Sequence, residues 1–155
     1  MKSQKALLKK TIPLAADLVN NLLSEARKAQ KKSYSPYSGF KIGASVLTDS
    51  GDIFSGANVE NSSYGATVCA ERVAIWNAVT DIESKIKSKK SFLDVICVVS
   101  SSADAWPPCG MCRQVISEFA HNDTIIITQG LKGPAKSYKF SELFPESFGA
   151  EFLKG

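Results

Sequence analysis

The feature that most constrains the fold of this chain is a near-continuous apolar run between Ser91 and Ser102. A run of this length and composition predicts a β-strand that is buried on both faces. Such a strand lies inside a sheet that other elements cover from both sides. The chain is therefore expected to be of the α/β class and to be built around a covered sheet.

The segments around this run supply the other elements. Apolar residues at helical spacing predict an amphipathic helix from about Thr11 to Gln30. Further patterns predict a β-hairpin of strands 40–48 and 52–59, a helix from near Thr67, a helix over 109–120, a buried strand over 124–128, and a short strand or turn before a tail with one helical turn. This order of elements predicts a mixed sheet with helices on both faces.

Length and composition fit one globular domain that spans residues 1–155. The 155 residues include 44% hydrophobic and 22% charged residues, which is ordinary for a protein with a buried core. The formal net charge is +4, and the lysines gather in pairs such as Lys31 and Lys32 without aromatic residues between them. This pattern is typical of solvated helix ends and loops, so we expect no nucleic-acid partner.

The first residues of the chain start like a signal peptide, but Lys9 and Lys10 interrupt the apolar segment and no small-residue cleavage site follows. No apolar run reaches membrane-spanning length, so we expect no membrane partner and a cytoplasmic location. Thiols stay reduced in the cytoplasm. The four cysteines are therefore expected to be metal ligands or reactive groups rather than disulfides.

Two cysteine motifs carry the strongest chemical signal. Cys69 stands at the start of one predicted helix, and Cys109 and Cys112 stand at Cys-x-x-Cys spacing at the start of the next. A helix amino terminus favours thiolates because of its dipole and its free N–H groups. Three thiolates suit a tetrahedral zinc ion and leave one position for water, as in a catalytic zinc site. The sequence therefore predicts one catalytic zinc ion.

Two charged residues follow Cys69 closely. Glu71 is near enough to reach the open zinc position without being a ligand, so it is the candidate general base. Arg72 comes next, and a guanidinium that is hydrogen-bonded to the sulfurs would withdraw negative charge from them. We expect that an enzyme without Arg72 needs a higher pH for activity.

The fourth cysteine and the one histidine are expected to have ordinary structural roles. Cys97 lies within the buried strand and is expected to be a small core residue. His121 is the only histidine, and it lies where a helical pattern ends and a strand pattern begins, where its charge suits a helix carboxyl terminus. A Ser-His-Asp triad or a Cys-His pair would have to use this one residue.

Together these motifs resemble the small zinc-dependent cytidine deaminases. The resemblance covers nearly the whole chain and rests on YSPYSGFKIGASVLT, GANVENSSYGATVCAERVAI, PPCGMCRQVISEF and LFPESF. It implies a three-layer α/β/α sandwich with a mixed five-stranded sheet, one zinc ion per subunit, a homotetramer with shared sites, and conversion of cytidine and deoxycytidine to the uridines in pyrimidine salvage. Trp106 and Pro107 depart from the pattern, because relatives often carry serine or glycine before Pro108.

The resemblance also implies roles for individual residues. It assigns Cys69, Cys109 and Cys112 to zinc, Glu71 to proton transfer, Asn58 and Glu60 to the ribose hydroxyls, Phe40 and the backbone of Ala70 to the pyrimidine, and Tyr64 and Phe148 to the boundary with a neighbouring subunit.

The ribose pair also has support from the residues themselves. Asn58 and Glu60 alternate at the end of a strand, so they point the same way, and an amide beside a carboxylate suits neighbouring hydroxyls. Glu60 would repel a phosphate, so a nucleoside is expected rather than a nucleotide. Capping of the turn after the strand is the alternative role for both residues.

Three other functions stay open from the sequence. A related deaminase of blasticidin S, a free base or RNA would share the zinc motifs. A thiol–disulfide oxidoreductase would use Cys109 and Cys112 but would need neither Cys69 nor Glu71. A non-enzymatic zinc module would use Cys97 as its fourth ligand.

Overall fold

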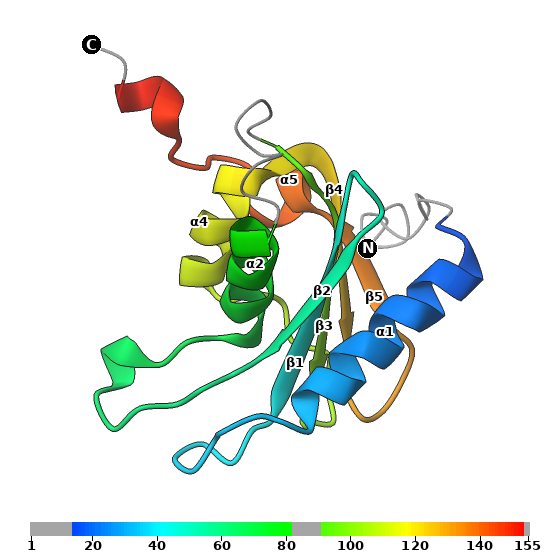
Figure 1. The fold of residues 1–155 in the computed structure, drawn as a ribbon, viewed down its shortest axis with the longest axis vertical. Helices are drawn as coiled ribbons and strands as arrows, with labels where there is room; N and C mark the ends of the chain where they lie inside the picture. The colour runs from blue at the N-terminus through cyan, green and yellow to red at the C-terminus, as the bar shows by residue number, and fades with distance from the viewer. Residues whose placement is uncertain (1–13, 82–90, 154–155) are drawn as a thin grey trace, which may run out of the picture.

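The sheet at the centre of the protein has five strands in the order β2-β1-β3-β4-β5 (Figure 1). The computed structural model describes residues 14–81 and 91–153. β3 and β4 run parallel, whereas the other neighbouring strands pair antiparallel, so the predicted mixed sheet is confirmed. The strands are β1 (Ile42–Thr48), β2 (Ile53–Ala57), β3 (Leu93–Ser100), β4 (Ala120–Gln129) and β5 (Lys136–Lys139).

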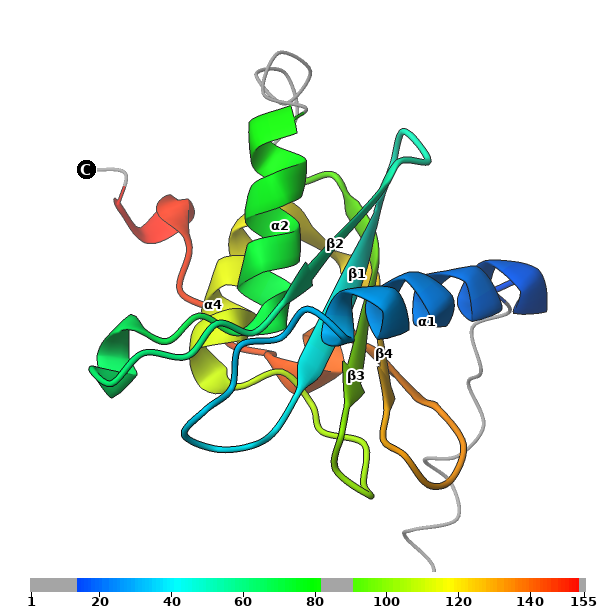
Figure 2. The ribbon, with the colours of Figure 1, turned by 60° about the horizontal axis from the view of Figure 1, so that its bottom comes forward.

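Helices cover both faces of this sheet and make the predicted three layers (Figures 1 and 2). α1 (Ala16–Gln30) lies on one face, whereas α2 (Ala70–Asp81) and α4 (Gly110–Phe119) lie on the other and contact each other. The shorter elements are α5 (Phe140–Leu143) and the 3-10 helices η1 (Tyr64–Ala66) and η2 (Ala150–Leu153). No helix in the described ranges has the length and apolar character needed to cross a membrane.

β3 is buried on both faces, as its sequence predicts. Ile96 and Val98 belong to the apolar cluster under α2 and α4. Val95, Cys97 and Val99 alternate with them and belong to the cluster under α1. The two clusters lie on opposite faces of one sheet.

The topology brings the starts of α2 and α4 together. β2 and β3 each pair antiparallel with β1, so they run in the same direction and end at the same edge of the sheet. α2 is the next α-helix after β2, and α4 follows β3 after a loop. Two helix amino termini therefore face this edge, which is where ligands bind in many α/β sheets.

Two predicted helix starts are corrected by the structure. α1 begins at Ala16 rather than near Thr11, and residues 11–13 lie outside the described residues. α2 begins at Ala70 rather than near Thr67. The residues just before α2 are extended because Val68 exchanges two backbone hydrogen bonds with Val59.

The predicted hairpin is present, but its strands are shorter than the sequence pattern suggests. β1 begins at Ile42 rather than at residue 40, and β2 ends at Ala57 rather than at residue 59. At this end the N–H of Asn58 still donates to the carbonyl oxygen of Ile42 (3.2 Å), and the side chain of Asn58 adds two hydrogen bonds. Its Oδ1 accepts from the N–H of Ile42 (2.8 Å), and its Nδ2 donates to the carbonyl oxygen of Phe40 (2.9 Å).

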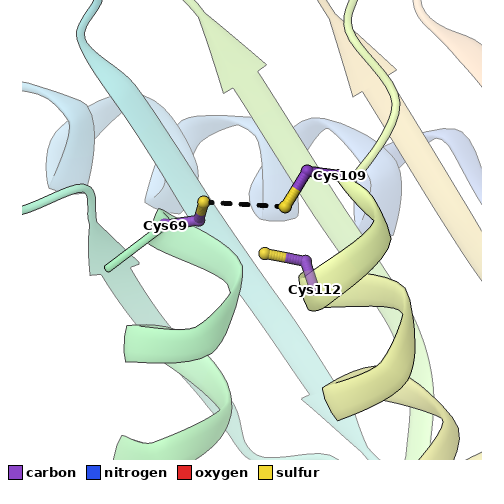
Figure 3. Close-up of side chains that lie close together, drawn as sticks. All are labelled: Cys69, Cys109 and Cys112. Atoms are coloured by element: carbon purple, nitrogen blue, oxygen red, sulfur yellow. Dashed lines mark hydrogen bonds between the residues drawn. The ribbon is translucent and has the colours of Figure 1, made fainter. Parts of the chain in front are cut away.

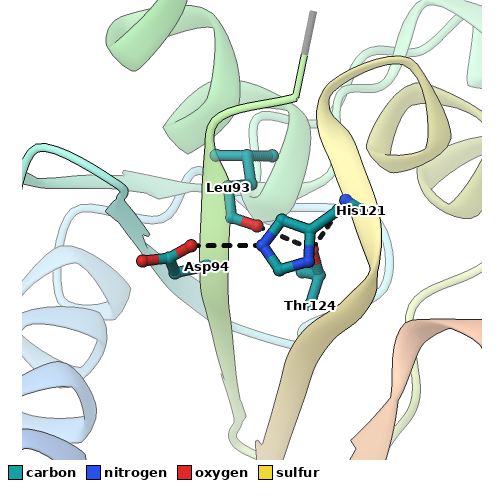
Figure 4. A network of polar contacts seen from close by, with 4 residues as sticks. All are labelled: Leu93, Asp94, His121 and Thr124. Atoms are coloured by element: carbon teal, nitrogen blue, oxygen red, sulfur yellow. Dashed lines mark hydrogen bonds and ion pairs between the residues drawn. The ribbon is translucent and has the colours of Figure 1, made fainter.

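β4 is longer than the predicted strand over 124–128, and it includes His121 (Figure 4). His121 therefore lies in the strand, two residues after the end of α4, where the helical pattern of the sequence gives way to a strand pattern. Oγ1 of Thr124 accepts from the N–H of His121 (2.9 Å) and donates to the carbonyl oxygen of Leu93 (2.6 Å). Nε2 of His121 lies 3.2 Å from Oδ1 of Asp94. These bonds bridge an irregularity in the pairing of β3 and β4.

Candidate metal centre and active site

Three cysteine thiols meet at the edge where α2 and α4 begin (Figure 3). Cys69 directly precedes α2, Cys109 is the N-cap of α4, and Cys112 lies in the first turn of α4. Their Sγ atoms lie within 4.8 Å of one another, and those of Cys69 and Cys109 are 3.9 Å apart. The two predicted motifs therefore form one cluster.

This cluster has the dimensions and chemistry of a zinc site. Two sulfur ligands at a Zn–S distance of about 2.3 Å and a tetrahedral angle stand about 3.8 Å apart, close to the 3.9 Å between Cys69 and Cys109. No other His, Cys, Asp or Glu of the described residues joins the group. Three ligands with a fourth position for water or substrate are typical of a catalytic site.

Cys97 is not part of this cluster. It is buried within β3 and belongs to the apolar cluster under α1, on the face of the sheet opposite to α2 and α4. Burial raises the pKa of its thiol to about 12. Cys97 is therefore the core residue that the sequence predicts, and a zinc module with Cys97 as its fourth ligand is excluded.

Arg72 lies against the cysteine cluster. Its Nη2 donates to the carbonyl oxygen of Thr67 (2.8 Å). Hydrogen bonds from Cys112 and Cys109, and then the hydrogen bond and charge of Arg72, lower the pKa of the Cys69 thiol to about 5. Nε of Arg72 is buried and has no hydrogen-bond partner, so it is an unused donor beside the cysteine cluster.

A cavity of about 260 Å³ opens beside the cysteines. Much of its wall is apolar and comes from Ile42, Val98 and Pro107, among others. The sequence-predicted residues that line it are Phe40, Asn58, Glu60, Cys69, Glu71 and Cys109. The fold thus gathers predicted residues from four separate segments around one space.

Glu71 is the second residue of α2 and lines this cavity together with Cys69 and Cys109. Only 4% of its surface is exposed. Burial, and after it the negative charge of Cys69, raises the pKa of Glu71 to about 7. A carboxyl group next to a metal-binding cluster and close to the reacting atoms is suited to proton transfer.

Asn58 makes the capping hydrogen bonds that the sequence offered as one of its two roles. Its Oδ1 accepts from Oγ of Ser33 (2.5 Å) and from the N–H of Ile42, so both lone pairs of that oxygen are used. Nδ2 donates one of its two hydrogens to Phe40. Asn58 therefore caps the start of β1 and keeps one N–H donor for a ligand.

Glu60 is held in place by the loop before Phe40. Its Oε2 accepts from the N–H groups of Tyr37 (2.9 Å) and Ser38 (3.1 Å), and its Oε1 accepts from the hydroxyl of Ser38. The hydroxyl of Ser38, followed by these backbone N–H groups, lowers the pKa of Glu60. Glu60 is therefore an ionised acceptor at the cavity wall.

Three of the predicted substrate-binding residues lie outside the lining of this cavity. Ala70 is fully buried at the start of α2. Tyr64 lines an adjacent hollow of about 270 Å³ that shares Glu60 with the cavity. Phe148 is 55% exposed and stacks on Phe152, with ring centres 5.7 Å apart, and its carbonyl oxygen accepts from Nε2 of Gln114 in α4 (2.9 Å). The described fold of one chain does not bring Phe148 to its own cavity.

The cavity also contains residues that the sequence did not single out. Ser38 orients Glu60, and Thr67 accepts from the N–H of Asn61 through Oγ1 (3.0 Å). Both lie in loops, where polar residues give no periodic signal. Trp106 also lines the cavity, but the sequence did point to it, because it departs from the family motif just before Pro108.

Comparisons with known proteins agree with this geometry. Residues 17–128 match the family model described as the cytidine and deoxycytidylate deaminase zinc-binding region. The chain is 38% identical over 135 residues to the cytidine deaminase of Sporosarcina psychrophila, and this alignment covers 87% of this chain and 94% of that protein. It is 32% identical over 111 residues to the blasticidin-S deaminase of Bacillus cereus, and this alignment covers 67% of this chain and 74% of that protein.

A solved structure shows the same fold. The cytidine deaminase from Burkholderia pseudomallei matches with a TM-score of 0.74 at 34% sequence identity. The match covers 83% of this chain and 98% of that chain.

Proposed function

Because this chain belongs to the cytidine and deoxycytidylate deaminase zinc-binding family, we propose that it hydrolyses cytidine and deoxycytidine to uridine and deoxyuridine, with release of ammonia, in pyrimidine salvage. One observation carries this proposal. A single cavity is lined both by the zinc-binding edge with Glu71 and by the hydroxyl-binding pair Asn58 and Glu60. A nucleoside needs both kinds of contact at once.

Each end of the reaction has its own residues. Zinc is held by Cys69, Cys109 and Cys112 and, when bound, supplies a polarised water for addition to C4 of the pyrimidine ring. Glu71 carries one proton to the ring nitrogen N3 and a second to the departing amine on C4. The overall reaction consumes one water and releases one ammonia.

The ribose contacts favour a nucleoside over a nucleotide. The free N–H of Asn58 donates to one hydroxyl, and the ionised Glu60 accepts from another. The charge of Glu60 would repel a phosphate group. The ring of Phe40, which lines the cavity, contacts the base.

Replacing Arg72 with alanine is expected to weaken zinc affinity or activity by about 10–100-fold, as for other residues that orient metal ligands. After the hydrogen bonds from Cys112 and Cys109, the hydrogen bond and charge of Arg72 also lower the pKa of Cys69, and this charge offsets that of the thiolates. Competition with a chromogenic chelator measures zinc affinity. Lys28→Ala, which removes an exposed cation from α1, is the control. Wild-type affinity and activity in the Arg72 variant would contradict this role.

We propose that the enzyme is a homotetramer in which Tyr64 and Phe148 complete a neighbour's site. Both side chains are exposed in the single chain, at 77% and 55%. An exposed aromatic residue is a common anchor for a partner surface.

Phe148→Ala is therefore expected to lower kcat/KM for cytidine by about 10-fold or more, the effect of losing one buried apolar contact, without changing zinc content. Light scattering gives the oligomeric state alongside the kinetics. A wild-type monomer with full activity would contradict the shared site.

Ammonia release from several substrates tests the proposed function. Cytidine and deoxycytidine are compared with cytosine, CMP and blasticidin S, each with and without a chelator. Chelator-sensitive turnover of the two nucleosides supports the proposal. Faster turnover of blasticidin S would instead assign the activity of the Bacillus cereus relative. Disulfide reduction without deamination would assign the oxidoreductase.

We also propose that residues 1–155 act as one domain in the cytoplasm. All four cysteines are free, in agreement with a reducing environment.

A further inference from the structure

Trp106 lies at the lip of the cavity and contacts Phe40. The two rings meet edge to face, with centres 4.7 Å apart and planes at 63°. Both residues line the cavity, and both keep part of their surface exposed, at 38% for Trp106 and 41% for Phe40. The pair is therefore both part of the wall and part of the opening.

The position of Trp106 is fixed from two sides. The N–H of Ser101 donates to the carbonyl oxygen of Lys41 (2.9 Å), and the N–H of Lys41 donates to Oγ of Ser101 (2.9 Å). These bonds tie the loop of Trp106 to the residue next to Phe40. On the other side, Pro107 and Pro108 restrict the backbone between Trp106 and the zinc ligand Cys109.

The proposed substrate has only one edge that matches this wall. Given the proposed function, C4 and N3 of the pyrimidine ring face the cysteines and Glu71, and N1 carries the sugar toward Asn58 and Glu60. The remaining edge, C5–C6, has only C–H groups. It loses no hydrogen bond against an apolar wall, whereas the N3–C2 edge would leave polar atoms unpaired.

We propose that Trp106 is a specificity-determining residue that limits the size of a substituent on C5 of the pyrimidine ring. The indole ring and Phe40 close the wall that the C5–C6 edge faces. An unsubstituted cytidine fits against this wall, whereas a bulky C5 group meets the indole. This inference rests on the proposed function and adds a substrate preference to it.

The kinetic test compares cytidine with 5-iodocytidine. The ratio of kcat/KM for 5-iodocytidine to kcat/KM for cytidine is expected to be about 10-fold or more higher in Trp106→Ala than in wild type. A size difference of one methylene group in an apolar pocket already changes kcat/KM by about 10-fold or more. Trp106→Phe keeps an aromatic ring and should change the ratio less. Leu131→Ala removes an exposed apolar residue outside the cavity and should leave the ratio unchanged. An unchanged ratio in Trp106→Ala, even with both rates lowered, would overturn the proposal.

A fluorescence test is independent of turnover. The chain has two tryptophans, so Trp76→Phe leaves Trp106 as the only one, and Trp106→Phe leaves Trp76. Saturating uridine, which is not turned over, is expected to change the emission of Trp76→Phe and not that of Trp106→Phe. Unchanged emission of Trp76→Phe on addition of uridine would overturn the proposed contact between Trp106 and the base. Failure of wild type to deaminate cytidine, with this response intact, would instead count against the proposed function alone.

Discussion

Replacement of Glu71 with glutamine is expected to lower kcat for cytidine by about 10²–10⁴-fold, the usual loss when a general acid–base group is removed. Glutamine has nearly the shape of glutamate, but it cannot take up and release a proton. Glu71 is almost fully buried and lines the cavity beside Cys69 and Cys109, next to the place of the proposed reacting atoms. Zinc content should stay near one ion per chain, because Glu71 is not a ligand.

The loss of cytidine absorbance measures turnover, and atomic absorption measures zinc in the same sample. Glu25→Gln is a matched control, since Glu25 pairs with Lys28 on the surface of α1 and lies outside the cavity. Near-normal turnover in Glu71→Gln would show that another group carries the proton. Loss of zinc together with turnover would show that Glu71 supports the metal site instead.

Much of the fold follows from local sequence patterns. The apolar alternation of β3 and the turn residues of the hairpin each lie within one short segment, and the structure contains both elements. The start of β4 could not be predicted in this way. Its polar residues join the strand because Thr124 bonds to the backbone of Leu93, which is 31 residues away. No local pattern encodes that contact.

The zinc cluster was predictable because each motif is short and because β2 and β3 end at the same edge of the sheet. The exact role of Asn58 was not. Its hydrogen-bond partners Ser33 and Phe40 lie 25 and 18 residues away, and only the folded chain shows that they use most of its amide. A motif predicts which residues meet a ligand, whereas the number of donors left for that ligand depends on tertiary contacts.

The role of Phe148 cannot be predicted from contacts within a single chain. The motif near the end of the sequence suggests an aromatic residue at a site, but this side chain stacks on Phe152 away from the cavity of its own chain. Spacing and periodicity describe contacts within one chain. Only a second copy could bring Phe148 to a substrate, so its role stays a prediction.

Two cysteine substitutions should separate the zinc site from the core. Cys112→Ala removes one of the three sulfur ligands, and we expect zinc affinity to fall by more than about 10²-fold, because even residues that only orient ligands account for 10–100-fold. Deamination should fall to background with the metal. Cys97→Ala removes an equally buried sulfur from the opposite face of the sheet, so zinc and turnover should be retained.

The Cys97 variant should lose only about 1 kcal/mol of unfolding free energy, the cost of a methyl-sized gap in the core. Zinc content, cytidine turnover and urea denaturation of both variants measure these differences. Loss of zinc in Cys97→Ala would contradict the placement of Cys97 under α1. Full turnover in Cys112→Ala would mean that the cluster at the starts of α2 and α4 does not hold the catalytic metal. Since both thiols are buried and both substitutions are the same, the variants differ in where the sulfur lies: in the cysteine cluster at the start of α4, or in β3 under α1.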